Sequence, residues 1–147
     1  MDMLKRIDKD IILAMRSKDK LRITVLRSLK TAIKYEAIET GAELSEEKIL
    51  SLFKSQVKSR QQAIELYKQG NRLELVEKEE NEIEIISEYL PVPLTEAEMI
   101  NATKRVISEL GATAMKDMGE VMKTLKTELG SRADGKILSN IVRKELS

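Results

Sequence analysis

The chain has 147 residues, a net charge of +1, and neither cysteine nor histidine. It therefore cannot form disulfides, thiol nucleophiles or tetrahedral zinc sites, and it lacks the side chain that most often transfers protons near neutral pH. The sequence contains neither a run of about 18 apolar residues nor the apolar core of a signal peptide. We therefore expect a cytoplasmic protein that does not enter a membrane.

Apolar residues recur at helical spacing through the first 90 residues, which predicts four helices. The breaks between them are the polar stretch 17–20, Gly41 followed by a candidate N-cap at Ser45, and the pair Gly70 and Asn71. The four apolar stripes are Leu4, Ile7, Ile11 and Met15; Leu21, Val25, Leu29 and Ile33; Ile49, Phe53, Val57, Ile64 and Tyr67; and Leu73, Val76, Ile83, Ile86 and Leu90. The aromatic residues are too few and dispersed for a base-stacking platform and are expected in the core. They are Tyr35, Phe53, Tyr67 and Tyr89.

Both prolines of the chain, Pro91 and Pro93, stand together and interrupt any helix. Thr95 and Glu98 then have the spacing of a capping box, which predicts the start of a fifth helix. The last three stripes are Met99, Val106 and Leu110; Met118, Val121, Met122, Leu125 and Leu129; and Ile137, Leu138, Ile141, Val142 and Leu146. The sequence thus predicts an all-α fold, with an N-terminal helical domain of about four helices (1–90) and a C-terminal three-helix domain (91–147).

Charge is unevenly distributed along the chain. Residues 1–34 carry ten Lys or Arg against four Asp, whereas residues 65–90 carry eight Glu against three Lys or Arg. These segments could attract each other within the fold. Alternatively, the first could present cations to phosphate: Lys5, Arg16, Lys20, Arg22, Arg27 and Lys30. The glutamates at 77, 80 and 84 share one side of a helix, but no Asp-rich loop accompanies them, so we expect no metal site.

The connection "GSRADG" at residues 130–135 is the strongest candidate for a functional site. Gly130 can close the preceding helix and Asp134 can cap the next one. Capping does not account for four nearby cations, which could bind a phosphate at the helix N-terminus. These are Arg132, Lys136, Lys123 and Lys126. Two interpretations remain open, capping alone and capping combined with anion contact.

Several motifs occur together in one order: "SRQQAIELYKQGNRLELVEKEENEIEII", "EYLPVPLTEAE", "DMGEVMKTL", "GSRADG" and "ILSNIV". This series resembles the GatB/YqeY family, and the chain is similar to its free-standing YqeY-like members over nearly its whole length. The positions that match the family's tail motif are expected to be mainly structural. They are Asp117, Gly119, Met122, Gly130, Ala133, Asp134 and Gly135.

The resemblance implies a C-terminal domain similar to the tail of the B subunit of the tRNA-dependent amidotransferase. That enzyme converts Glu-tRNA(Gln) or Asp-tRNA(Asn) to the amide form with glutamine as the amide donor, and its tail contacts tRNA while the chemistry lies elsewhere. The family label is carbon–nitrogen ligase activity with glutamine as amido-N-donor. No catalytic constellation, phosphate-activating cradle or glutaminase Ser/Lys signature is visible in this chain, so we read the label as inherited from the shared domain.

Three hypotheses follow, and we expect neither a cofactor nor a metal. The first is a non-catalytic accessory protein that binds tRNA or a tRNA–enzyme complex. The second is a protein-interaction module that docks on an amidotransferase or an aminoacyl-tRNA synthetase, for which the seven methionines could supply an adaptable surface. The third, amidotransferase catalysis, is the least favoured because the residues it needs are missing, and whether the chain is an enzyme stays open.

Overall fold

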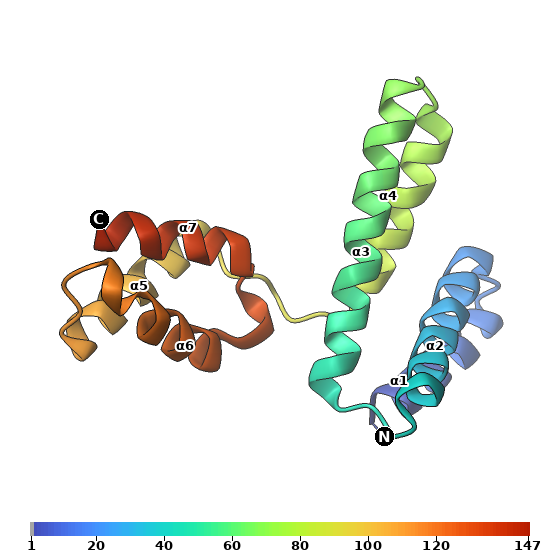
Figure 1. Ribbon diagram of the computed structural model, residues 1–147. Helices are drawn as coiled ribbons and strands as arrows, with labels where there is room; N and C mark the ends of the chain where they lie inside the picture. Colours follow the sequence, from blue (N-terminus) through green and yellow to red (C-terminus); the bar gives the residue numbers. More distant parts are fainter. Residues whose placement is uncertain (1) are drawn as a thin grey trace. The chain divides into compact units, whose positions relative to one another are not determined.

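The computed structural model describes residues 2–147, which form seven α-helices and two short 3₁₀ turns with no strand among them (Figure 1). The all-α fold class is confirmed. Contacts divide the chain into two compact units, Met1–Leu90 (unit 1, described from Asp2 onward) and Pro91–Ser147 (unit 2). That each unit folds on its own as a domain stays a prediction. None of the helices in the described part combines the length and apolarity needed to cross a bilayer.

Unit 1 contains the helices α1 Asp2–Arg16, α2 Lys20–Thr40, α3 Glu46–Gln69 and α4 Leu73–Ser87. Local side chains set where α2 and α3 begin. Asp19 accepts a hydrogen bond from the Arg22 backbone amide at 3.1 Å, and Ser45 accepts one from the Lys48 amide, also at 3.1 Å. Gly41 ends α2 in the left-handed conformation, at φ 71°. At the α3–α4 turn that conformation is taken by Asn71, at φ 54°, and not by Gly70.

The core of unit 1 joins all four helices. Phe53 of α3 is fully buried and meets the Tyr89 ring edge-on, with ring centroids 6.4 Å apart. The buried cluster comprises Met3, Ile7, Val25, Leu26, Leu29, Ile33, Leu44, Ile49, Phe53, Ile85, Ile86 and Tyr89.

Three inward positions predicted for unit 1 are wrong. Met15 is 52% exposed, Tyr35 64% and Leu73 65%. Helical spacing alone does not show where a neighbouring helix ends. At the end of α1 the buried residue is Ala14, one position earlier, while Leu73 opens α4 at the turn that joins it to α3.

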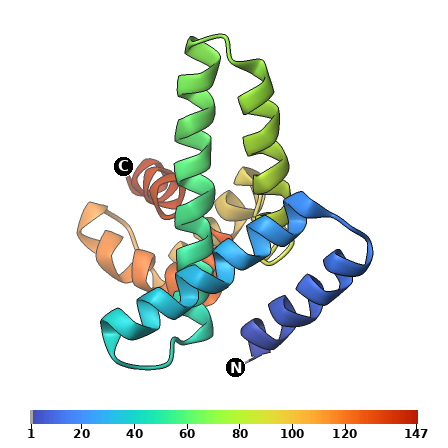
Figure 2. The same cartoon turned by 90° about the vertical axis from the view of Figure 1, so that its right-hand side faces the viewer.

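Helices α3 and α4 form an antiparallel hairpin whose far end projects past α1 and α2 (Figures 1 and 2). Ile64 and Val76 are buried in this projecting part, outside the main cluster. Between the two helices, Arg60 Nη1 lies 3.3 Å from a Glu79 carboxylate oxygen and also bonds to Glu82, which is 7% exposed. This ion-pair group crosses the hairpin where the main core no longer reaches.

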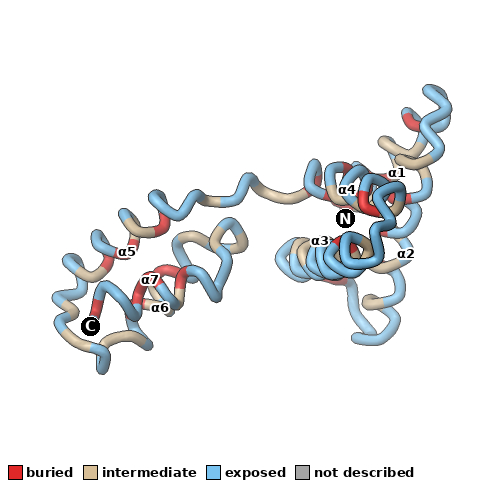
Figure 3. Tube along the Cα trace, turned by 90° about the horizontal axis from the view of Figure 1, so that it is seen from above, coloured by how far each residue is buried: buried red, intermediate tan, exposed pale blue. Residues whose placement is uncertain are grey.

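Unit 2 is a three-helix arrangement of α5 Glu96–Leu110, α6 Met118–Leu129 and α7 Gly135–Leu146, with 3₁₀ turns η1 Met115–Asp117 and η2 Gly130–Arg132. The predicted capping box is confirmed, because Thr95 Oγ1 accepts from the Glu98 amide at 3.1 Å and the Thr95 amide donates to Glu98 at 3.5 Å. The buried cluster comprises Met99, Val106, Val121, Leu125, Leu138, Ile141, Val142 and Leu146. Figure 3 shows that buried residues recur at intervals along these helices, as an amphipathic pattern requires. Leu110 and Ile137, predicted on the inward stripes, are exposed.

Candidate nucleic-acid interface

The connection at residues 130–135 holds a 3₁₀ turn, η2, that the sequence did not predict. Gly130 opens it at φ 57° and ψ −142°, and its amide donates to the Lys126 carbonyl. A residue with a Cβ rarely adopts a positive φ, so the backbone requires glycine at this position. Ala133 follows η2 in extended conformation and packs against the core of unit 2.

Asp134 caps helix α7. Its Oδ1 accepts hydrogen bonds from the Lys136 amide at 2.9 Å and the Ile137 amide at 3.0 Å. The carboxylate therefore satisfies two of the amides that an outside anion would otherwise bind at this helix end. Gly135 has an ordinary φ, and a Cβ added there would contact nothing within 4 Å, so neither conformation nor packing requires it to be glycine.

Arg132 has a partner that sequence reasoning missed. Its Nε donates to the Val92 carbonyl at 2.9 Å, and the Leu94 amide donates to the Arg132 carbonyl at 2.9 Å. Two hydrogen bonds therefore join η2 to the segment that leads into α5. The two contacting residues are 40 positions apart, and no local pattern indicates such a pairing.

The three lysines of the candidate site are exposed, and their ammonium groups have no partner among the described residues. Lys123 and Lys126 lie on the outer side of α6, away from the buried Val121 and Leu125. Gly119 shares that side through i, i+4, i+7 spacing with the two lysines, and a Cβ there would contact nothing. Lys136 stands in the first turn of α7.

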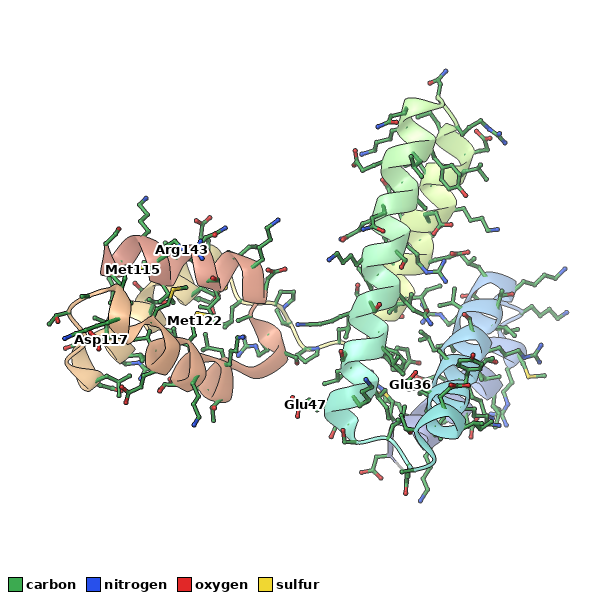
Figure 4. All side chains as sticks on the ribbon, in the orientation of Figure 1. Glu36, Glu47, Met115, Asp117, Met122 and Arg143 are labelled. Carbon is green, nitrogen blue, oxygen red and sulfur yellow. The ribbon has the colours of Figure 1, made fainter. Side chains whose placement is uncertain are left out.

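Asp117 has a structural role at the α5–α6 connection. Its Oδ2 accepts from the Thr113 amide at 2.9 Å and the Ala114 amide at 3.3 Å. These backbone hydrogen bonds hold the pKa of Asp117 below its ordinary value, because they stabilise the carboxylate form. Figure 4 shows Asp117 beside Met115 at one end of unit 2, while Met122 lies farther along α6, where it packs against the core.

Other carboxylates of unit 2 are also engaged. Arg105 lies 3.3 Å from Glu109 and bonds to Glu128, and these two glutamates raise the pKa of the guanidinium. Glu98 closes the capping box at the start of α5. Five of the eight acidic residues in 91–147 thus either accept backbone hydrogen bonds at a helix start or pair with Arg105. None of the ion pairs in the described part of unit 2 involves a lysine of α6 or α7.

The basic segment at residues 1–34 is partly neutralised within unit 1. Arg22 lies 2.5 Å from Glu88 and also contacts Asp19, and Lys30 lies 2.5 Å from Asp8. The expected attraction between the basic and acidic segments is therefore present at Arg22 and Glu88. The other four proposed cations are exposed, with no partner in the described structure: Lys5, Arg16, Lys20 and Arg27.

A cleft of about 420 Å³ lies in unit 1, and its polar groups satisfy one another. The Arg6 guanidinium lies 4.4 Å from the centre of the Tyr89 ring and donates to the Glu88 carbonyl at 3.0 Å. The Tyr89 hydroxyl donates to Asp10, and burial, followed by this carboxylate, raises the pKa of Tyr89. No group of three or more metal-ligating side chains occurs in the described residues.

Comparison with known proteins places the motifs in context. The family model described as "Yqey-like protein" matches residues 4–146. "Altered inheritance of mitochondria protein 41, mitochondrial" of Lachancea thermotolerans is 38% identical over 75% of this chain, and the match spans 60% of that relative's length. The proteins of the same name from Pyrenophora tritici-repentis and Saccharomyces cerevisiae are 27% and 28% identical over 96% and 81% of the chain, and over 79% and 70% of their own lengths.

The expected cytoplasmic location is wrong by this comparison, because the relatives' names assign those proteins to mitochondria. The prediction relied on a search for signal peptides and long apolar runs. Mitochondrial targeting segments are amphipathic and rich in arginine and serine, so neither test detects them. Amino-acid composition does not distinguish a protein of the cytoplasm from one of the mitochondrial interior.

Proposed function

Because the chain belongs to the Yqey-like protein family, we propose that it is a non-catalytic accessory protein that binds tRNA through unit 2. The observation that carries the proposal is the set of exposed, unpaired lysines on either side of the "GSRADG" connection: Lys123, Lys126 and Lys136. Phosphate contacts of this kind supply most of the affinity of a protein that recognises nucleic acid by backbone and shape.

Two features of the surface suit a polyanion. The outer side of α6 combines Lys123 and Lys126 with Gly119, whose missing side chain lets a ligand approach the backbone closely. Glu120 is the neighbouring acid on that surface, three residues before Lys123. The Asp134 carboxylate already occupies the amides at the start of α7, so lysine side chains, and not the helix N-terminus, would provide the contacts.

Arg132 has two roles in this proposal. Its Nε holds the Val92 carbonyl, while its exposed terminal nitrogens have no partner in the described structure and remain available to phosphate. Replacement of Arg132 would therefore alter both the fold of the connection and the charge. The lysines give the cleaner test.

The test is a salt series of tRNA binding by the purified chain, against an unrelated RNA of similar length. Each phosphate contact contributes about 0.7 to 0.9 to the log–log slope, so Lys123→Ala with Lys126→Ala should flatten the slope by about 1.4 to 1.8. The control variant, Lys104→Ala with Lys144→Ala, removes the same charge from exposed positions elsewhere in unit 2 and should change the log–log slope less. If both double variants flatten the slope equally, the binding is non-specific charge attraction. If the parent chain does not bind tRNA at low salt, the proposal is wrong.

The second candidate function is a protein-interaction module that docks on an amidotransferase or an aminoacyl-tRNA synthetase. Tyr35 and Ile38, one turn apart on α2, are exposed by 64% and 78% and form an apolar surface of the kind that partners cover. The methionines offer less than the sequence suggested, because Met3 and Met99 are buried. Retention of either enzyme from a lysate after nuclease treatment, and its loss with Tyr35→Ser and Ile38→Ser, would favour this function over tRNA binding.

A further inference from the structure

Helix α1 carries a row of exposed residues opposite its buried side. Lys5, Lys9, Ile12 and Arg16 follow the spacing i, i+4, i+7, i+11, so they line one side of the helix. We call these four residues the basic row. The buried residues of α1 lie on the opposite side: Met3, Ile7 and Ala14. The three cations of the row, Lys5, Lys9 and Arg16, form no ion pair with any residue of the described structure.

Helix α4 carries a matching row of opposite charge. Leu73, Glu77, Glu80 and Glu84 have the same i, i+4, i+7, i+11 spacing, and all four are exposed. We call them the acidic row. Of the buried residues of α4, Glu82, Ile85 and Ile86 lie on other sides of the helix, whereas Val76 borders the row, three residues after Leu73 and four before Glu80. The three glutamates of the row have no ion-pair partner in the described residues, unlike Glu79 and Glu82, which face Arg60.

When their helices run antiparallel, the two rows bring opposite charges together at two of their four positions. The intervals of four, three and four residues read the same in both directions, and each row spans about 16 Å of helix at 1.5 Å per residue. In this register Lys5 lies opposite Glu84 and Lys9 opposite Glu80. Ile12 and Arg16 then lie opposite Glu77 and Leu73, which brings the two apolar residues to the same end of the contact.

We propose that unit 1 is a self-association surface, on which the basic row of one copy packs antiparallel against the acidic row of a second copy. Both rows belong to unit 1, and a two-fold dimer in which one face of each copy carries both rows would form the contact twice. The partner is a second copy because the complementary row is present in the chain itself. RNA would be repelled by the acidic row, and the exposed Ile12 and Leu73 suit a protein surface better than a phosphate backbone.

The expected association is weak and sensitive to salt. Exposed ion pairs contribute little individually, and screening shortens their range from about 10 Å at 0.1 M salt to about 3 Å at 1 M. Sedimentation equilibrium of the full chain at low and high salt measures both properties. We expect dimer at low salt and loss of dimer at high salt.

Charge reversal identifies the contact. Lys9→Glu and Glu80→Lys should each weaken dimerisation at least about tenfold, because the altered pair occurs twice in a two-fold dimer. The double variant restores opposite charges at both positions and should recover the dimer. Lys58→Glu, at an exposed position of α3 outside both rows, is the matched control and should leave dimerisation unchanged. Circular dichroism checks that each variant is folded.

Three results would overturn the inference. A chain that stays monomeric at low salt has no such surface. A dimer that withstands both single reversals associates elsewhere. A monomer whose RNA binding is lost with Lys9→Glu uses the basic row for nucleic acid instead. The first two outcomes do not bear on the lysines of α6 and leave the proposed tRNA function to its own test, whereas the third would also count against RNA binding through those lysines.

Discussion

Arg132→Ala tests the contact between η2 and the segment that precedes α5. The substitution removes the hydrogen bond from Nε to the Val92 carbonyl, whereas the bond from the Leu94 amide to the Arg132 carbonyl does not depend on the side chain. A typical hydrogen bond contributes about 0.5 to 1.5 kcal/mol, and one from a charged donor up to about 3 kcal/mol. Because Arg132 is exposed, we expect the free energy of unfolding of unit 2 to fall by about 1 kcal/mol.

The distribution of aromatic residues provides the assay. The chain has three tyrosines, one phenylalanine and no tryptophan, and all four aromatic residues precede Leu90. Tyrosine fluorescence therefore follows unit 1 alone, whereas far-ultraviolet circular dichroism follows both units. In urea, Arg132→Ala should lower the midpoint of the transition seen by circular dichroism for unit 2 and leave the tyrosine midpoint in place.

Two further variants separate geometry from charge. Arg132→Lys keeps the charge but cannot present the Nε–H at the same position, so it should remain destabilised. Arg143→Ala, whose exposed guanidinium makes only a 3.4 Å contact with Asn140, should stay within about 0.3 kcal/mol of the parent. A stability of Arg132→Ala equal to that of the parent would refute the structural role. An equal shift of both signals would refute separate unfolding of the two units.

Three other substitutions have outcomes that follow from the structure. Asp134→Ala should cost unit 2 about 1 kcal/mol in urea denaturation, and Asp134→Asn much less, because asparagine still accepts from the first-turn amides of α7. Arg60→Ala should lower the free energy of unfolding of unit 1 by about 2 to 3 kcal/mol, measured by tyrosine fluorescence, because it leaves the buried Glu82 without its cation. If the double variant Arg60→Met with Glu82→Leu is equally destabilised, the unpaired carboxylate is not the cause. The pKa of Asp117 is lowered on folding, so its stabilising effect is complete above the unfolded pKa and is lost as pH falls through the folded one. Acid titration of unit 2, followed by circular dichroism, should therefore show a loss of stability below about pH 4, and Asp117→Asn should make this loss smaller. If Asp117→Asn leaves the titration unchanged, this assignment is contradicted.

The sequence was most informative where structure is determined by neighbouring residues. The capping box at Thr95 and the caps at Ser45 and Asp134 depend on side chains two or three positions from the amides they bind, so their spacing predicts them. The same locality explains the correct all-α fold and the positions of the helices.

Prediction failed where distant parts of the chain decide the outcome. The contact between Arg132 and Val92 joins residues 40 positions apart, and nothing at either residue indicates the other. Met15 and Leu73 fit an apolar stripe, yet no helix covers them, because a stripe does not record the length of its neighbour. The lysines of the candidate site were identified from charge alone, and tRNA binding there stays a prediction.

The projecting hairpin gives α3 two environments along one helix. Its first half packs Ile49 and Phe53 into the four-helix core, whereas beyond Arg60 it contacts mainly α4 through Ile64. Local opening of the far end therefore breaks mainly contacts between α3 and α4 and leaves the core intact. In native-state hydrogen exchange, amides near Tyr67 should exchange well before those near Phe53, so a continuous helix would behave as two cooperative segments.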